Sequence, residues 1–169
     1  YSISVGKIVN IISRFNSNKQ DFFTDNLGNN FEKKLYSTFL SFLPTNRWFY
    51  NVKVNEDERG KFLEFIKTKK SGQLSIFSIN PKQIRGGHFH HTKNERFIII
   101  NGKVKVFFKN VLNNKMITKI IDTKKNRVFR SIPGWAHKIQ NITSEKIYDV
   151  FWANELLNIK KPDTIKILL

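Results

Sequence analysis

The spacing of apolar residues changes near Pro44, so the two parts of the chain predict different kinds of element. Before Pro44, apolar residues recur three or four positions apart, which is the spacing of one face of an α-helix. The pattern therefore predicts a first helix near the start of the sequence. Its apolar face is expected to consist of Val5, Ile8, Val9, Ile12 and Phe15.

A second helix is expected after a polar loop, with Asn30 as its cap and Pro44 as its end. Two helices of this size cannot bury both apolar faces alone. They need the following domain, a partner or an upstream domain, and we favour the upstream domain. The loop contains Asn16, Asn18, Asp25, Asn26, Gly28 and Asn29, and the second apolar face contains Phe31, Leu35, Phe39 and Leu43.

From Trp48 onward the period falls towards two, and β-branched and aromatic residues become frequent, which is typical of strands. Asn101-Gly102 predicts a hairpin, because both positions of a tight two-residue turn need positive φ. Many short strands separated by turn residues predict a sandwich or a closed barrel. The strands are expected at residues 48–54, 62–67, 73–79, 97–100, 103–109, 116–121, 128–132, 138–141 and 147–152.

Length and composition narrow the class of protein. The 169 residues suffice for one domain with a real core and a short extra segment. The absence of cysteine excludes thiolate zinc sites, disulfides and cysteine nucleophiles. No apolar run approaches the roughly 20 residues that span a bilayer, and no signal peptide is apparent. We therefore expect a cytoplasmic location and no membrane role.

The charge of the chain changes this interpretation little. Lysine and arginine number 30 against 13 acidic residues, which gives a formal net charge of +17. Such a field attracts phosphate-bearing partners, but a nucleic-acid surface normally concentrates its charge on one face. Here the lysines are scattered over every expected element. A nucleic-acid partner is therefore not expected, although salt-dependent binding to DNA or RNA remains an alternative to test.

All four histidines lie in two short stretches, which suggests a metal or acid/base site. His88 and His90 are two positions apart, so both project from the same face of a strand. Glu95 begins the next expected strand, and His137 comes from a later one. Imidazole and carboxylate ligands suit zinc, iron, manganese or nickel. These side chains are expected to converge on one cation.

Both stretches resemble the motifs of the cupin superfamily. The first resembles the first cupin motif and the second resembles the second, although Lys82 and Arg127 stand where glycines are usual. This resemblance implies an all-β, double-stranded β-helix, or jelly roll, with the metal inside the barrel and two short N-terminal helices before it. The matching residues are His88, His90, Glu95 and Gly102 in the first motif, and Pro133, Gly134, His137 and Asn141 in the second.

Two further resemblances are more specific. Segments 58–64 and 85–88 are similar to segments of sugar-nucleotide epimerases of the dTDP-4-dehydrorhamnose 3,5-epimerase kind. Residues 31–38, 43–44, 90–95 and 161–164 resemble capsular polysaccharide assembling proteins of the CapF type. That family implies that residues 1–45 are the helical tail of an upstream short-chain reductase domain. Residues 46–169 would then form the cupin domain.

The CapF resemblance also implies a function. It indicates a metal-dependent epimerase acting at the third carbon of a UDP-linked 4-keto-6-deoxy-N-acetylhexosamine, in UDP-N-acetyl-L-fucosamine biosynthesis for surface polysaccharide. Zinc, or another divalent metal, would be the cofactor, and the protein would form a homodimer. NADPH would belong to the missing upstream domain, because this chain lacks the nucleotide-binding glycine fingerprint. The alternative is a non-catalytic, metal-binding cupin module for nucleotide-sugar binding or dimerisation.

Several residues have expected roles in such a site. His88, His90, Glu95 and His137 are the expected metal ligands. The expected catalytic residues are His88, Glu95 and Tyr148, with Tyr148 as an acid on the opposite face or, more simply, as a core residue. His88 cannot be ligand and free base through one nitrogen, and we favour the ligand. Arg59 and Arg85 are expected to bind the diphosphate, and the other expected substrate contacts are Glu64, Lys93 and Trp135.

Overall fold

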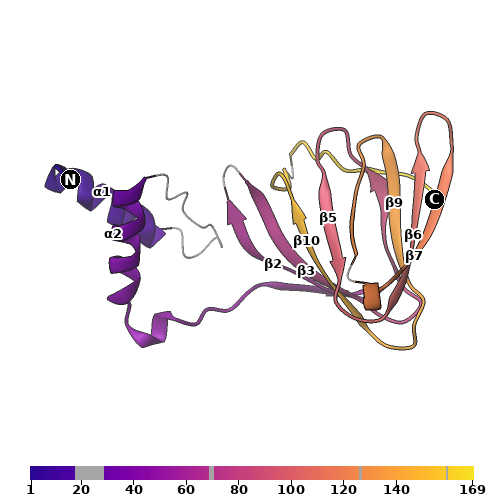
Figure 1. The fold of residues 1–169 in the computed structure, drawn as a ribbon, viewed down its shortest axis with the longest axis horizontal. Coiled ribbons are helices and arrows are strands. Elements are labelled where there is room, and N and C mark those ends of the chain that lie inside the picture. Colours follow the sequence, from indigo (N-terminus) through magenta and orange to yellow (C-terminus); the bar gives the residue numbers. More distant parts are fainter. Residues whose placement is uncertain (18–28, 69–70, 126, 159) are drawn as a thin grey trace.

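The computed structural model describes residues 1–17, 29–68, 71–125, 127–158 and 160–169. A pair of helices is joined by an extended segment to a barrel of two sheets (Figure 1). Most of the expected polar loop, including Asn18, Asp25, Asn26 and Gly28, lies outside the described residues. No helix in the described parts of the chain combines the length and the apolar character needed to cross a bilayer.

The helices α1 (Val5–Ser17) and α2 (Asn30–Ser41) form as predicted, with two corrections. The cap of α2 is Asn29 rather than Asn30, because Asn29 has extended backbone angles and its side chain accepts the Glu32 N–H at 2.8 Å. In α1, Ile11 and Phe15 are buried, whereas three residues of the expected face are exposed. Contact with α2 selects the buried face: the Phe15 ring lies 4.9 Å from that of Tyr36. The exposed residues are Val5, Val9 and Ile12.

The expected strand at residues 48–54 does not form. A short 3-10 turn, η1 (Thr45–Arg47), is followed by an extended segment in which Trp48, Phe49 and Tyr50 are all exposed. A strand needs a hydrogen-bonded neighbour, and pairing in this region begins only at β1 (Val54–Asp57). The aromatic residues that suggested a strand therefore lie on the connection between helices and barrel.

Two antiparallel sheets make up the barrel, and the remaining expected strands form within a few residues of their expected bounds. One sheet has the order β1-β2-β3-β10-β5-β8, and the other has the order β11-β4-β9-β6-β7. Apart from Val54, strands β1, β4 and the two-residue β11 lie outside the expected ranges, although His88 and His90 were expected on a strand; β4 carries His88 and ends before His90. The bounds are β2 (Gly60–Thr68), β3 (Gly72–Ile79), β4 (Ile84–Phe89), β5 (Glu95–Ile99), β6 (Lys103–Asn110), β7 (Met116–Asp122), β8 (Val128–Arg130), β9 (Trp135–Asn141), β10 (Ile147–Ala153) and β11 (Ile165–Lys166), with the 3-10 turn η2 (Thr123–Lys125) after β7.

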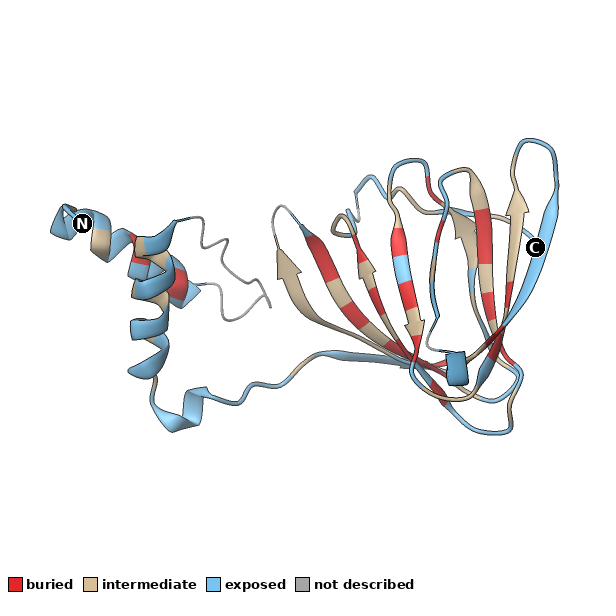
Figure 2. Cartoon of the chain, in the orientation of Figure 1, coloured by how far each residue is buried: buried red, intermediate tan, exposed pale blue. Residues whose placement is uncertain are grey.

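Alternating side chains of the two sheets fill the barrel, as the period of two requires. Buried and less buried positions alternate along the strands (Figure 2). Aromatic rings dominate the middle of the core: Phe97 stacks on Phe151 and Phe129 at centroid distances of 5.5 and 5.0 Å. This packed layer leaves one end of the barrel for polar side chains. The remaining core includes Phe77, Ile79, Ile99, Val104, Val106, Ile121, Ile139 and Ile147.

Gly72 begins β3, and the structure predicts that it cannot be replaced. Its φ is +80°, and an added Cβ would lie 1.7 Å from the Ala153 carbonyl oxygen. Gly134 has a similar φ of +74°, but its added Cβ would meet nothing within 4 Å. We expect Gly134→Ala to lower the free energy of unfolding by about 1–2 kcal/mol, from the left-handed backbone alone. Gly72→Ala should cost more than about 3 kcal/mol, because strands β3 and β10 must also separate.

Urea unfolding monitored by circular dichroism would measure both glycine variants. Equal losses in the two would show that the contact between Gly72 and Ala153 does not limit the packing of the sheet.

Candidate metal centre

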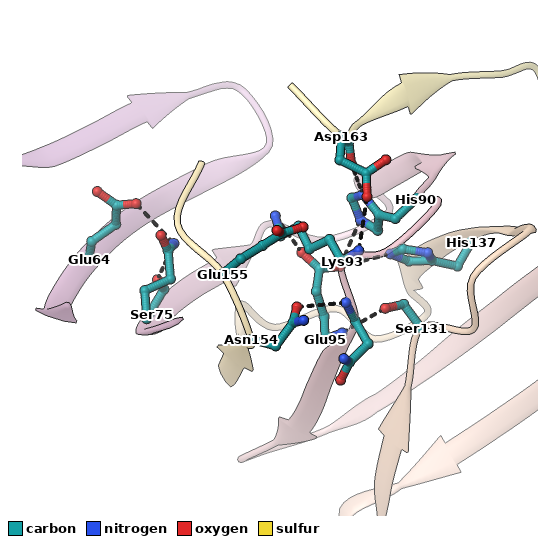
Figure 3. A network of polar contacts seen from close by, with 12 residues as sticks. Glu64, Ser75, His90, Lys93, Glu95, Ser131, His137, Asn154, Glu155 and Asp163 are labelled. Atoms are coloured by element: carbon teal, nitrogen blue, oxygen red, sulfur yellow. Dashed lines mark hydrogen bonds and ion pairs between the residues drawn. The ribbon is translucent and has the colours of Figure 1, made fainter. Parts of the chain in front are cut away.

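The structure brings together the four residues that the sequence predicts as ligands. His88 lies on β4, His90 follows that strand, Glu95 begins β5, and His137 lies on β9. One ligand atom from each residue lies within 4.8 Å of the others. Three of the four are buried, and His88 is the most exposed. Figure 3 shows His90, Glu95 and His137 pointing towards one another.

A close approach between β4 and β9 aligns two of the histidines. The pairing of these strands shifts register between Gly86 and His88, and beyond the shift His88 lies directly opposite His137. Gly86 has a φ of +97°, and a Cβ there would lie 2.6 Å from the His137 carbonyl oxygen. Only glycine tolerates both conditions. The glycine pair before the histidines therefore places His88 on the face of the sheet that carries His137.

The spacing of the donor atoms fits a small divalent cation. Glu95 Oε2 lies 3.3 Å from His90 Nε2 and 3.4 Å from His137 Nε2. A tetrahedral zinc ion with bonds of about 2.0–2.1 Å separates its ligand atoms by about 3.3 Å. Imidazole nitrogen and carboxylate oxygen are also the donors that zinc and related metals take in proteins. The buried cluster is therefore able to hold a metal ion.

Neighbouring groups hold the His90 ring and the backbone of Glu95. His90 Nδ1 contacts the backbone carbonyl oxygen of Asp163, to which it donates its proton. His90 Nε2 is then unprotonated and can act as a ligand. The backbone N–H of Glu95 donates to Ser131 Oγ at 2.7 Å. His137 Nδ1 is buried without a hydrogen-bond partner in the structure, while its Nε2 faces Glu95.

The charges around Glu95 also suit a cation. Burial alone would raise the pKa of Glu95, but its contacts with His137 and His90, with the nearby Lys93, outweigh it and hold the pKa far below its usual range. Lys93 Nζ lies 3.1 Å from Glu95 Oε1, which leaves Oε2 facing the histidines. Burial and the neighbouring His137 lower the pKa of His88 to about 4. At neutral pH the cluster therefore contains a carboxylate beside a neutral His88.

Asp57 brings Arg59 and Arg85 together, through contacts that involve none of the four clustered residues. Arg59 forms two side-chain bonds with Asp57 Oδ2, at 3.0 and 2.5 Å. Arg85 donates to the carbonyl oxygens of Ser78 and Lys61, and its Nη2 lies 3.9 Å from Asp57 Oδ1. Both guanidinium groups therefore have protein partners. Their predicted contact with a diphosphate stays a prediction.

Glu64 and Trp135 lie on the inner faces of their strands. Glu64 on β2 is opposite Ser75, and its Oε1 accepts a hydrogen bond from Gln73 Nε2 at 2.9 Å. Figure 3 shows Glu64 and Ser75 to one side of the histidine cluster. Trp135 precedes His137 by two positions on β9, so the two side chains project from the same face.

Tyr148 is not brought to the cluster. It lies on β10 between Ile147 and Asp149, which are both buried inside the barrel, and is itself 48% exposed. Successive side chains of a strand alternate between its faces, so Tyr148 faces outwards. It is therefore not the core residue, and it does not point into the barrel, where the expected acid on the opposite face of the sugar would have to lie.

Sequence reasoning missed three polar residues associated with the cluster. Ser131 and Asp163 hold Glu95 and His90 from distant parts of the chain, and no spacing signal in the sequence links them. Asp149, in contrast, has a signal. Its position in the alternating pattern of β10 directs it into the barrel, where a carboxyl group is unusual. Both its oxygens are buried without a hydrogen-bond partner in the structure.

Comparisons with known proteins agree with this fold. Residues 55–165 match the family described as polysaccharide biosynthesis C-terminal domain. The chain is 37% identical, over 97% of its length, to a UDP-2-acetamido-2,6-beta-L-arabino-hexul-4-ose reductase of Pseudomonas aeruginosa. A crystal structure of the capsular polysaccharide assembling protein CapF from Staphylococcus aureus superposes on the whole chain with a TM-score of 0.94 and 35% identity.

The coverage of these relatives is partial. The chain spans 44% of the Pseudomonas protein and 46% of that Staphylococcus chain. An oxalate decarboxylase from Lactobacillus farciminis, 20% identical with a TM-score of 0.55 over 68% of this chain and 33% of its own, shares the fold alone. The predicted jelly roll is thus confirmed. The chain belongs to the polysaccharide biosynthesis C-terminal domain family, as a cupin of the kind found in the C-terminal part of CapF-type capsular polysaccharide assembling proteins.

Proposed function

We propose that the chain is a metal-dependent epimerase that acts at the third carbon of a UDP-linked 4-keto-6-deoxy-N-acetylhexosamine. The observation that carries this proposal is the buried His88, His90, Glu95 and His137 cluster in a capsular-polysaccharide cupin. The name of the Pseudomonas relative describes a UDP-linked acetamido sugar with a ketone at the fourth carbon. The carbon beside such a ketone is the position at which proton removal is easiest.

The chemistry needs three kinds of group. Removing a proton beside a ketone produces an enolate, so an epimerase needs a base, an acid and a positive group near the developing oxyanion. Bound zinc, or a related divalent cation, would supply the positive charge that polarises the ketone oxygen. His90, Glu95 and His137 would hold this ion. The neutral His88 would either complete the ligand set or, with its nitrogen free, accept the proton from the third carbon.

Lys93 is suited to act as the acid. Tyr148 cannot fill this role within its own barrel, because its side chain faces outwards. The side chain of Lys93 is 11% exposed, and its ammonium group lies 3.1 Å from Glu95 Oε1, beside the cluster. It can donate a proton to the sugar or a hydrogen bond to the enolate oxygen. Trp135, on the face that carries His137, would contact the sugar ring, and Glu64 would accept hydrogen bonds from its hydroxyls.

Arg59 and Arg85 would bind the diphosphate in this proposal. Arg59 is exposed and would exchange the carboxylate of Asp57 for a phosphate, since a guanidinium binds either in a bidentate manner. The zinc cofactor, the UDP-sugar partner and the homodimer are all parts of the proposal. The cytoplasmic location and the assignment of residues 1–45 to an upstream domain stay predictions.

Metal analysis combined with solvent exchange tests the function. The purified chain should contain about one zinc or related ion, and should exchange deuterium from D₂O into the third carbon of the 4-keto UDP-sugar. Chelator treatment should abolish the exchange, and added metal should restore it, because the cation stabilises the enolate.

Tyr148→Phe is the matched control and should retain the full exchange rate, since its side chain faces outwards. Exchange that persists after complete metal removal would overturn the metal-dependent mechanism. A metal-loaded chain that binds the UDP-sugar without exchanging deuterium would instead establish the non-catalytic binding module.

A further inference from the structure

Asp163, near the end of the chain, makes an unusual number of contacts with the loop between His90 and Glu95. Its Oδ1 accepts the backbone N–H of His91 at 2.8 Å. Its Oδ2 accepts the N–H groups of Thr92 and Lys93 at 2.8 and 2.9 Å, and the Thr92 hydroxyl at 3.1 Å. One carboxylate thus holds three successive backbone N–H groups of the segment that separates two candidate ligands.

The backbone of Asp163 contacts a ligand directly. Its carbonyl oxygen accepts the proton on His90 Nδ1, as described above. Figure 3 shows Asp163 beside His90, on the side away from Glu95 and His137. The carboxylate and the carbonyl of one residue therefore act together: the first fixes the loop, and the second fixes the ring that the loop carries.

The residues after Asp163 pair with β4, the strand that carries His88, and so hold Asp163 in place. In β11, Ile165 pairs with Phe89 and Lys166 pairs with His88. Ile167 N–H donates to the Gly87 carbonyl oxygen at 3.0 Å.

We propose that Asp163 is a positioning residue for the metal centre, which keeps His90 in the Nδ1-protonated form with Nε2 directed at the cation. This inference rests on the metal site of the proposed function and is independent of the sugar. An imidazole that donates through one nitrogen to a fixed carbonyl can offer only the other nitrogen to a metal. If the acceptor moves, the ring can rotate or change tautomer, and the free energy of fixing it must come from metal binding.

Zinc affinity measured by competition with a chromophoric chelator tests the proposal. Asp163→Asn keeps the size of the side chain but places an NH₂ group against N–H donors of the loop. We expect its zinc affinity to fall about 10- to 100-fold, which is the usual effect of losing a group that orients a metal ligand. Thr92→Val is the matched control. It removes the hydroxyl contacts with Asp163 and Glu155, leaves the backbone N–H contacts of Asp163 in place, and should change the affinity less than about threefold.

Imidazole ¹⁵N resonances of the metal-free proteins provide the readout that a merely structural role would not move. In the wild type, His90 should be protonated at Nδ1, and in Asp163→Asn it should become a mixture of tautomers. If Asp163→Asn does not fold, Asp163→Glu keeps the charge with a longer side chain and should show a smaller loss of affinity in the same direction.

The outcomes separate this inference from the proposed function. Unchanged zinc affinity and tautomer in the Asp163 variants, in a chain that exchanges deuterium, would overturn the role of Asp163 alone. A fall in zinc affinity in a chain that never exchanges deuterium would overturn the epimerase alone. An equal loss of affinity in Thr92→Val and Asp163→Asn would also overturn the role of Asp163, since the hydroxyl would then account for the effect.

Discussion

Glu95→Gln should abolish metal binding at physiological metal concentrations and with it the exchange of deuterium. Glu95 is the single carboxylate in the cluster, and its Oε2 lies within 3.4 Å of both His90 Nε2 and His137 Nε2. Glutamine has the same shape, but it removes the negative charge and can turn an NH₂ group towards the two nitrogens. Replacing a group that hydrogen-bonds to a metal ligand already costs about 10- to 100-fold in metal affinity. Loss of the ligand itself should therefore cost more than about 100-fold.

Glu64→Gln is the matched control for this prediction. It makes the same chemical change on an inward-facing strand residue, where the carboxylate accepts from Gln73 and pairs with Lys67 instead of facing the histidines. Zinc affinity in this variant should match that of the wild type, although its KM for the sugar can rise. Isothermal titration with zinc would measure both variants. Wild-type affinity in Glu95→Gln would exclude Glu95 as a ligand.

Asp149→Asn should make the stability of the protein much less sensitive to pH. Asp149 is fully buried, and neither carboxyl oxygen has a hydrogen-bond partner in the described structure. Burial, and secondarily the charge of Glu95, raises the pKa of Asp149 well above its usual value. The folded protein therefore binds this proton more tightly than the unfolded chain does.

The sign of the pH effect follows from this difference. Because the folded state holds the extra proton, the contribution of Asp149 to stability is greatest below the unfolded pKa of about 3.9 and is lost as pH rises towards the folded pKa. Over that interval the wild type should lose about 1.4 kcal/mol per pH unit relative to Asp149→Asn. Urea unfolding of both proteins at several pH values between 5 and 8 measures the difference.

Asp122→Asn supplies a control of opposite sign. The backbone N–H of Lys124 and the side chain of Lys103 lower the pKa of Asp122, so its replacement should remove stability at neutral rather than acidic pH. If the difference between Asp149→Asn and wild type stays constant across the pH range, the carboxyl of Asp149 has an ordinary pKa and another group relieves its burial.

The barrel was predictable because most of its strands have one buried face. In β10, Ile147 and Phe151 alternate with more exposed residues, and the period of two is visible in the sequence. The segment at residues 48–54 has the same aromatic character but no hydrogen-bonded neighbour, and composition cannot reveal whether a neighbour exists. The N-cap error has a similar cause: Asn29 and Asn30 have equal propensity, and only the backbone angles distinguish them.

In the candidate site, too, some features were predictable from the sequence and others were not. His88 and His90 are two residues apart, and His137, the cross-strand partner of His88, lies in a second motif. Residue type and spacing were therefore enough to group them with Glu95. Tyr148 was assigned to the site on its chemistry, but the alternation of its strand directs it outwards.

Asp163 had no such signal. It acts from 70 to 72 residues away, through hydrogen bonds to backbone groups that carry no sequence information.

The pairing of β11 with β4 also has a consequence for the order in which the protein folds. The loop before Glu95 is short, but its anchor Asp163 arrives only after the chain has made every other strand of both sheets. Closing so long a loop carries an entropic cost that local hairpins such as β6 and β7 avoid. A nascent or refolding chain would therefore complete most of its hydrophobic core before it could hold a cation tightly. Metal capture would then mark the end of folding and would disfavour release of the C-terminal strand.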